Sequence, residues 1–193
     1  MSRIGTSFPC GKPAIREWIK AHIPENSKIL DIGAGGGTYF DLLQDLNYTM
    51  DAIEVYEPAV NIIINKYRSV FFMDLREFEF VEDYDLVIMG DVLEHLSVQD
   101  AQKTLDYILQ HTKYLLIGVP FNFYQGPEDD NPLEEHLQSD LDQRVMKERY
   151  PQLQLLLYII NYTERIWVAD GSPCPTYLAY YYAKGALNNE SQN

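Results

Sequence analysis

The sequence predicts an α/β fold in which strands and helices alternate around one largely parallel sheet. Short runs rich in aliphatic and β-branched residues alternate with stretches of helical periodicity, which is the pattern of successive strand–helix units. The run YDLVIMGD at residues 84–91 has a continuous apolar centre, as expected of a strand buried on both faces. With 193 residues, 46% hydrophobic content and no internal repeat, the chain is expected to form a single domain.

The elements follow one another regularly through the first part of the chain. An amphipathic helix is expected at residues 12–23, because Ile15, Ile19 and Ile23 share one face and Pro13 lies in the first turn. Strands are predicted at residues 28–33, 50–55, 69–74, 84–91 and 113–121, and helices between them at 38–47, 57–67 and 98–111.

The alternation stops after the fifth predicted strand. Residues 121–140 form a long polar and aromatic segment, and loops of this length in compact domains are usually functional or disordered. A helix at 140–150 and two closing strands at 155–170 and 177–185 are expected to follow. The closing strands are predicted to be antiparallel, and residues 186–193 read as a frayed tail.

The net charge of −14 excludes several classes of partner. Binding along a nucleic-acid backbone requires clustered lysine and arginine, so no nucleic acid is expected as a partner or substrate. Anionic membrane surfaces are disfavoured for the same reason, and no run of residues is long and apolar enough to span a bilayer. A neutral or cationic small molecule remains compatible with this charge.

The chain has two cysteines, Cys10 and Cys174, and its N-terminus has no signal-peptide pattern. A cytoplasmic protein with two free thiols is therefore expected. The four histidines are scattered without HxxxH or CxxC spacing, so no metal site is predicted.

A glycine-rich turn is the strongest functional signal. In ILDIGAGGGTYFDLL, at residues 29–43, four glycines separate a predicted strand from a predicted helix, a position that suits an anion or a nucleotide. No Lys-Ser or Lys-Thr pair follows, so the phosphate-binding GxxxxGK[ST] motif is absent. The dinucleotide motif GxGxxG also fails, because Thr38 stands where the third glycine should be.

The residues Asp31-Ile32-Gly33-Ala34-Gly35-Gly36-Gly37 instead fit the pattern [D/E]-x-G-x-G-x-G. In this the chain resembles the class I S-adenosylmethionine-dependent methyltransferases, and matching segments continue in order to about Pro120. Glu54 ends the second predicted strand, Asp74 follows the third, and GDVLEHL ends the fourth. Glycines allow the close approach of a ligand to the backbone, and an acidic residue complements the ammonium of the cofactor's methionine part.

The resemblance implies a Rossmann-like, doubly wound, seven-stranded sheet that is mostly parallel with a reversed last strand. It implies that Glu54 accepts from both ribose hydroxyls, that Asp74 accepts from the adenine amino group, and that Asp91 lies beside the reactive end. Asp74 suits a simple turn equally well. The full set of expected contacts with S-adenosylmethionine, or with its product S-adenosylhomocysteine, is Asp31, Gly33, Ala34, Gly35, Glu54, Val55, Asp74, Leu75 and Asp91.

The expected function is transfer of a methyl group from S-adenosylmethionine to an oxygen or nitrogen of a small molecule. A base is needed only for an alcohol or a protonated amine, and His136 is the first candidate and His95 the second. His95 also fits a structural role, and His136 fits a surface loop. Methyltransferases that act on adenine or glutamine nitrogens resemble one another in a [D/N]-P-P-[Y/F] motif, and this chain has GDVLEH instead.

Two alternatives stay open from the sequence. The first is a non-catalytic domain of the same fold that binds the cofactor or serves as a partner subunit, and a homodimer is also compatible. The second, a nicotinamide-dependent oxidoreductase, is disfavoured by Thr38. The expected single domain comprises an N-terminal helical region (1–27), a cofactor-binding core (28–120), a substrate or lid loop (121–140), a closing helix with strands (141–185) and the tail (186–193).

Overall fold

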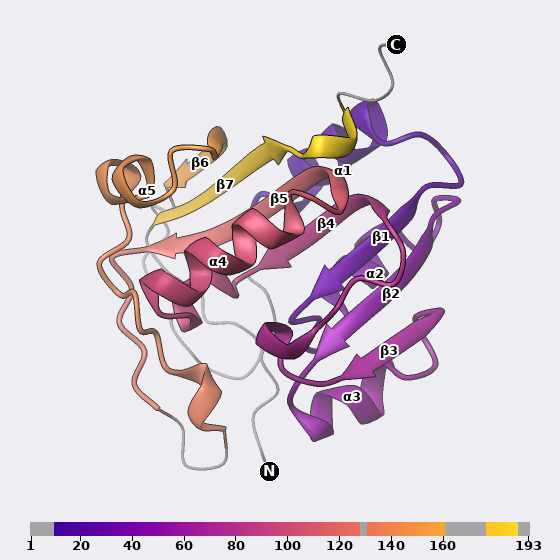
Figure 1. Ribbon diagram of the computed structural model, residues 1–193, viewed down its shortest axis with the longest axis horizontal. Coiled ribbons are helices and arrows are strands. Elements are labelled where there is room, and N and C mark those ends of the chain that lie inside the picture. The colour runs from indigo at the N-terminus through magenta and orange to yellow at the C-terminus, as the bar shows by residue number, and fades with distance from the viewer. Residues whose placement is uncertain (1–9, 128–130, 161–176, 189–193) are drawn as a thin grey trace.

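The computed structural model describes residues 10–127, 131–160 and 177–188. Within them lies one seven-stranded sheet of order β3-β2-β1-β4-β5-β7-β6 (Figure 1). The strands are β1 (Lys28–Ile32), β2 (Thr49–Glu54), β3 (Ser69–Phe72), β4 (Tyr84–Gly90), β5 (Thr112–Phe121), β6 (Gln154–Ile160) and β7 (Tyr177–Lys184). The helices are α1 (Lys12–His22), α2 (Thr38–Leu43), α3 (Glu57–Ile63), α4 (Val98–Ile108) and α5 (Gln143–Arg149).

The sheet is parallel from β3 to β5, and β7 runs antiparallel to both of its neighbours, β5 and β6. This confirms the predicted Rossmann-like sheet with a reversed last strand. The later part of the predicted strand at 155–170 falls outside the described residues, as do Cys174 and most of the expected tail. The free thiols therefore stay a prediction.

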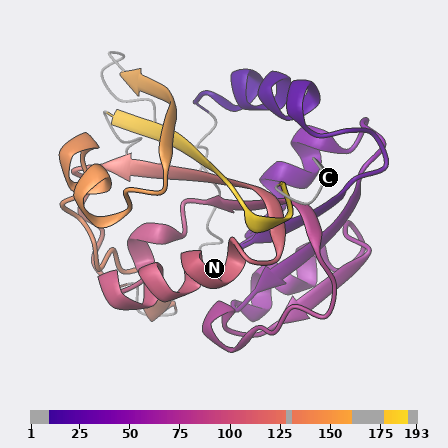
Figure 2. The ribbon, with the colours of Figure 1, turned by 45° about the horizontal axis from the view of Figure 1, so that its top comes forward.

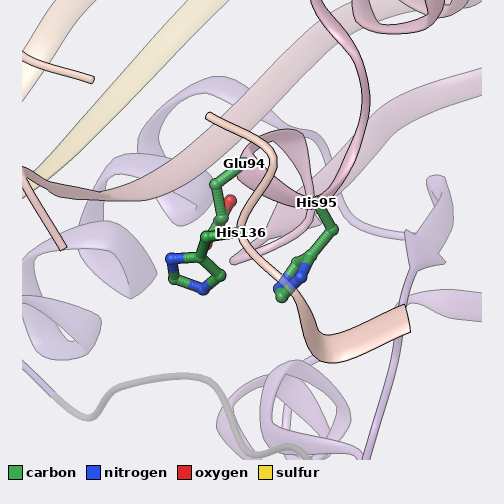
Figure 3. A group of neighbouring side chains, drawn as sticks. All are labelled: Glu94, His95 and His136. Atoms are coloured by element: carbon green, nitrogen blue, oxygen red, sulfur yellow. The ribbon is translucent and has the colours of Figure 1, made fainter. Parts of the chain in front are cut away.

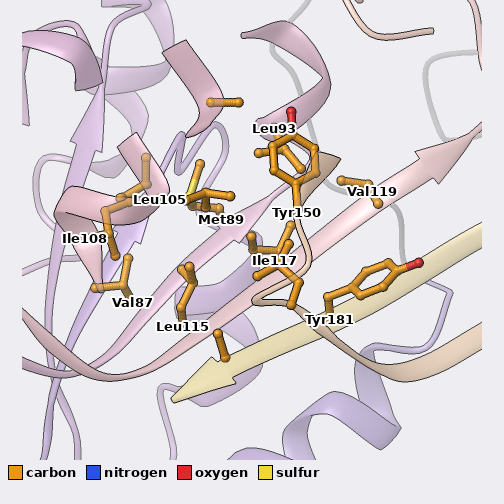
Figure 4. Close-up of a cluster of buried hydrophobic side chains, with 14 of the residues drawn as sticks. Val87, Met89, Leu93, Leu105, Ile108, Leu115, Ile117, Val119, Tyr150 and Tyr181 are labelled. Carbon is orange, nitrogen blue, oxygen red and sulfur yellow. The ribbon is translucent and has the colours of Figure 1, made fainter. Parts of the chain in front are cut away.

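Helices cover both faces of the sheet (Figure 2). Each face has its own apolar core. Alternate residues of one strand enter different cores: in β4, Val87 and Met89 pack towards α4 and α5, while Leu86 and Ile88 pack towards α1, α2 and α3. Figure 4 shows the first of these cores. A strand buried on both faces needs apolar residues at every position, which is why its sequence reads as a continuous apolar run.

Several helices are shorter than predicted, for a local reason. The predicted helix 38–47 ends at Leu43, and the predicted helix 57–67 ends at Ile63. Both helices end in a 3₁₀-type turn, in which a backbone N–H donates to the carbonyl oxygen three residues earlier. Leu46 N donates to the Leu43 carbonyl oxygen and Lys66 N to the Ile63 carbonyl oxygen, each at 2.8 Å. Such tight final turns are common at helix ends, and hydrophobic periodicity does not detect them.

The order of strands places a switch point between β1 and β4. The chain leaves β1 towards β2 on one side, and the second half of the sheet begins at β4 on the other. Open α/β sheets bind ligands in the crevice outside the carboxyl ends of the strands at such a point. No helix in the described ranges is long and apolar enough to cross a membrane.

Candidate active site

The glycine turn between β1 and α2 has a backbone that ordinary residues rarely adopt. Gly33, Gly35 and Gly37 have φ angles of 66°, 51° and 87°. A side chain at Gly33 would also collide with Val92, because its Cβ would lie 2.5 Å from the Val92 Cγ2 atom. The turn is anchored to β2 by bonds from Gly33 N and Ala34 N to the Ile53 carbonyl oxygen, at 2.9 and 3.3 Å. It therefore forms a side-chain-free cradle at the switch point.

Glu54 lies at the end of β2 and faces this cradle. Its Oε2 accepts from Gly35 N at 2.7 Å, and its Oε1 accepts from the backbone N–H groups of Val55 and Tyr56, each at 2.8 Å. A carboxylate offers about four acceptor positions, so these bonds use three and leave one on Oε2. The bidentate acceptance of two ribose hydroxyls that the resemblance implies would therefore require the bond to Gly35 to open.

Asp31 lies at the end of β1 and is only 1% exposed. Burial raises the pKa of its carboxyl from 3.8 to about 7, although the Tyr67 hydroxyl, which donates to Asp31 Oδ2 at 2.5 Å, and the charge of Lys12 oppose this rise. Lys12 is itself buried, and burial lowers its pKa to about 8 against the charges of Asp91 and Asp31. At physiological pH Asp31 is therefore only partly ionised, and a cationic ligand group would favour its ionised form.

Asp91 follows β4 directly and has the left-handed φ of 58° that non-glycine residues seldom adopt. Its N–H donates to the Gly118 carbonyl oxygen of β5 at 2.9 Å, which holds this turn against the neighbouring strand. Its charge acts on Lys12, Glu94 and His136. The charge of Asp91 therefore reaches both the start of the N-terminal helix and the group around the histidines. Backbone strain such as its positive φ is concentrated at functional sites.

The structure gives Asp74 a local role in a turn. Its side chain caps the 3₁₀ turn η1 (Leu75–Glu77) by accepting from Arg76 N at 2.8 Å, and it pairs with the Arg76 guanidinium at 2.5 Å. That pairing lowers the pKa of Asp74. Leu75 packs against the first core, and Val55 is 38% exposed. Contact of these three residues with a cofactor remains a prediction.

The turn after β4 and the long loop bring together three side chains that are distant in sequence (Figure 3). Glu94 and His95 belong to the 3₁₀ turn η2 (Leu93–His95), and His136 follows the 3₁₀ turn η3 (Pro132–Glu134) of the loop. The two imidazole rings meet edge to face with centroids 4.7 Å apart. His136 is 7% exposed, so it does not face water as a loop histidine would.

Burial sets the protonation of this group. Burial, followed by the neighbouring His136, lowers the pKa of His95 to about 4, and burial lowers the pKa of His136 as well. Both imidazoles are therefore neutral at physiological pH. Burial raises the pKa of Glu94 well above its usual range, and the charges of Asp91 and Glu134 raise it further.

A buried glutamine fastens the loop to the turn after β4. The amide nitrogen of Gln138 donates to the carbonyl oxygens of Leu93 and Leu96 at 3.0 and 3.1 Å, and its backbone N–H donates to the Glu94 carbonyl oxygen at 3.0 Å. Its side-chain oxygen accepts from the Tyr150 hydroxyl at 2.8 Å. This network fixes where His136 lies relative to η2.

Sequence reasoning missed Lys12, Tyr67, Glu94 and Gln138. Lys12 opens an amphipathic helix whose periodicity predicts only a packing role, and Tyr67 lies at the end of a predicted helix. For Glu94, the only signal was its place in the segment GDVLEHL. The expectation of no metal site rested on spacing within short segments, which cannot report on side chains that the fold brings together.

The fold and the glycine turn define an open α/β domain of the kind that binds a ligand at the switch point of its sheet. Residues 12–159 match a family described as "Methyltransferase domain", which covers well over half of the chain. The chain belongs to this methyltransferase family, in agreement with the resemblance to the class I S-adenosylmethionine-dependent methyltransferases. No curated protein matches the chain by sequence.

Solved structures have the same fold at low sequence identity. An S-adenosylmethionine-dependent methyltransferase from Clostridium acetobutylicum ATCC 824 superposes with a TM-score of 0.64 at 12% identity, over 90% of this chain and 91% of that one. TehB from Haemophilus influenzae gives a TM-score of 0.64 at 21% identity, over 90% and 62%. The N-methyltransferase NodS from Bradyrhizobium japonicum WM9, in complex with S-adenosylhomocysteine, gives 0.62 at 14% identity, over 90% and 84%.

Proposed function

We propose that this methyltransferase transfers the methyl group of S-adenosylmethionine to an oxygen or nitrogen atom of a small-molecule acceptor. The observation that carries the proposal is the position of Asp31 and Glu54, two interacting carboxyls, beside the glycine turn at the switch point of the sheet. The two carboxyls suit the ammonium and the ribose of the cofactor. At Gly33 the Val92 side chain already fills the place of a Cβ atom, so the turn has no room for a side chain at that position.

The cofactor, when bound, supplies a methyl group that its sulfonium charge already activates. The work left to the chain is to hold the acceptor in line and to exclude water. Asp31 would hold the ammonium, Glu54 the ribose, and the loop carrying His136 would cover the acceptor beside Asp91. A neutral imidazole can accept a proton from an alcohol, so His136 and His95 are the proposed candidates for a base.

The acidic chain and the short loop support a small acceptor. The net charge of −14 opposes docking of nucleic acid, and the loop at 121–140 is a long insertion between β5 and α5. NodS, with a similar fold, is named as an N-methyltransferase, and ChlM from Synechocystis PCC 6803 as a magnesium protoporphyrin IX methyltransferase. A catalytically silent domain acting as a partner subunit is the second candidate, because the predicted base has no demonstrated acceptor.

Calorimetric titration with S-adenosylhomocysteine tests the cofactor site. We expect micromolar binding that falls at least tenfold in Asp31→Asn and in Glu54→Gln, which keep side-chain size, and stays unchanged in the matched surface variant Asp45→Asn. Equal binding by all four proteins would overturn the assigned site. Methyl transfer from labelled cofactor to a panel of phenols, alcohols and amines then separates the enzyme from the silent domain.

A further inference from the structure

The group formed by Glu94, His95 and His136 has the composition of a metal site. One ligand atom from each residue lies within 4.8 Å of the others, and Figure 3 shows the side chains coming from two separate segments. Two imidazoles and one carboxylate are a common donor set for divalent transition-metal ions. A cation about 2.0–2.2 Å from each ligand would place neighbouring ligand atoms roughly 3–4 Å apart, which small side-chain rotations can achieve.

Each histidine is oriented as a metal ligand would be. The Nδ1 atom of His95 lies 3.1 Å from the Glu135 carbonyl oxygen, and that of His136 lies 2.8 Å from the Phe123 carbonyl oxygen. A carbonyl oxygen only accepts, so Nδ1 must carry the proton in both rings. The lone pair of each neutral ring is then on Nε2. Metal-binding histidines are typically held in this way, with the other ring nitrogen donating to a carbonyl or carboxylate.

Glu94 supplies an independent observation. Glu94 is 1% exposed, and within the described residues neither of its carboxylate oxygens has a hydrogen-bond partner in another residue; its own backbone N–H favours its ionised form. Moving an ionised carboxylate from water into the protein interior costs free energy, and only a nearby opposite charge or a hydrogen-bond donor offsets that cost. The neighbouring charges that act on Glu94 are those of Asp91 and Glu134, and because both are acidic they disfavour its ionised form further.

We propose that Glu94, His95 and His136 bind a divalent transition-metal cation whose remaining positions take an oxygen of the methyl acceptor. The cation compensates the buried acid and uses both free ring nitrogens. Glu94 and His136 are buried and His95 is half-buried, so an acceptor would have to approach the cation from the side of His95. The acceptor's part in this inference rests on the proposed function, whereas the binding of the metal does not.

This site narrows the reaction to transfer to oxygen. A bound cation lowers the pKa of a coordinated hydroxyl, which loses its proton to solvent near neutral pH. The resulting oxyanion forms a bond to the methyl carbon as the carbon–sulfur bond breaks, and the sulfur keeps that electron pair and becomes neutral. The histidines then act as ligands rather than as bases.

A protonated Glu94 beside two packed histidines is the competing explanation, and direct metal binding separates the two. Protein freed of metal by chelation and dialysis is titrated with Co²⁺, whose visible absorption reports nitrogen and oxygen coordination, and with Zn²⁺, Mn²⁺ and Mg²⁺ by calorimetry. The test variants are Glu94→Gln and His136→Ala. The control is His111→Gln, which replaces a histidine outside the group. S-adenosylhomocysteine binding is measured on every protein.

We expect one Co²⁺ per chain with new visible bands, at least tenfold weaker binding in Glu94→Gln and His136→Ala, and normal binding in His111→Gln. Absence of these bands from the unaltered protein, or equal affinity in all variants, would overturn the metal site. Retained S-adenosylhomocysteine binding shows that a variant has folded and that its loss of metal is specific. If the unaltered protein does not bind S-adenosylhomocysteine, the proposed function is contradicted, and the Co²⁺ titration still decides whether the metal site exists.

Discussion

At the scale of single residues, the site contains acidic side chains that are buried with few positive charges near them. Asp31 contacts Tyr67 and is affected by Lys12 and Glu54, and its carboxyl has a pKa of about 7. Below that pH the folded protein holds a proton on Asp31. A ligand whose ammonium needs the carboxylate must therefore displace that proton.

The first prediction concerns the pH dependence of cofactor binding. Because Asp31 must ionise, the affinity for S-adenosylhomocysteine should rise as the pH increases from 5 to about 7, by up to about tenfold per pH unit. Calorimetry in buffers of different ionisation enthalpy should detect the released proton. Asp31→Asn should bind more weakly and release no proton at pH 6. Unchanged proton release in that variant would assign it to another group, such as Lys12.

The same raised pKa predicts an opposite effect on the stability of the ligand-free protein. A carboxyl with a pKa raised in the folded state stabilises it most below its unfolded value, and this contribution is lost as the pH rises from about 4 to about 7. Asp31→Asn should therefore be more stable than the unaltered protein at pH 8, by roughly 2–4 kcal/mol. Urea unfolding at pH 5 and pH 8 measures the difference, which should be smaller at pH 5.

Gln138 allows a test of positioning. Gln138→Ala removes the donor to the carbonyl oxygens of Leu93 and Leu96 and leaves these buried groups without it, so the free energy of unfolding should fall by about 1–3 kcal/mol. The exposed Gln102, whose amide donates to the Arg149 carbonyl oxygen, is the matched control. Urea unfolding of Gln138→Ala and Gln102→Ala gives the comparison. Equal stabilities would mean that Gln138 does not fasten the loop.

Residues of this kind mark the limit of what the sequence could predict. The places of Asp31 and Glu54 near the ends of their strands were predictable, because each strand has a clear pattern next to the glycine turn. Glu94 and His136 come from different segments, and their proximity depends on how the loop returns across η2. The composition of a loop does not encode that path, so sequence reasoning named His136 as a candidate base and missed Glu94 beside it.

At the scale of elements, strands were predicted more accurately than helix ends. Each strand of the parallel half enters two cores, and a continuous apolar run bounded by polar residues locates it within a residue or two. Helix ends depend on single hydrogen bonds such as that of Leu46 with Leu43, which periodicity does not report. The helix predicted at 140–150 likewise begins later, at Gln143, where Asp142 caps its first turn by accepting from Val145 N at 2.7 Å.

The glycine turn gives a prediction at this scale. Gly33→Ala should weaken S-adenosylhomocysteine binding at least tenfold, because its Cβ would meet Val92 at 2.5 Å and the φ of 66° is unfavourable for alanine. The double variant Gly33→Ala/Val92→Ala removes the collision and keeps the strained φ, so it should recover part of the loss. Calorimetry of the two variants and of Val92→Ala separates these causes. No recovery in the double variant would rule out the collision.

At the scale of the whole molecule, charge determines which partners can approach. With a net charge of −14, the chain should show no saturable binding of a fluorescent DNA duplex or RNA strand at low salt, where attraction to phosphates is strongest. Fluorescence anisotropy measures this, with a basic DNA-binding protein as the positive control. Salt-sensitive, saturable binding would reopen the question of a nucleic-acid acceptor.

The position of β7 between β5 and β6 also has a consequence for how the chain is made. β6 leaves the ribosome before β7 but pairs only with it, so β6 has no strand partner until the later segment arrives. The parallel half, which carries the glycine turn and Glu54, can meanwhile assemble from segments already synthesised. A nascent chain would therefore acquire its cofactor cradle first, with an unpaired strand edge exposed on β5, and would depend on β7 to cover that edge before another chain does.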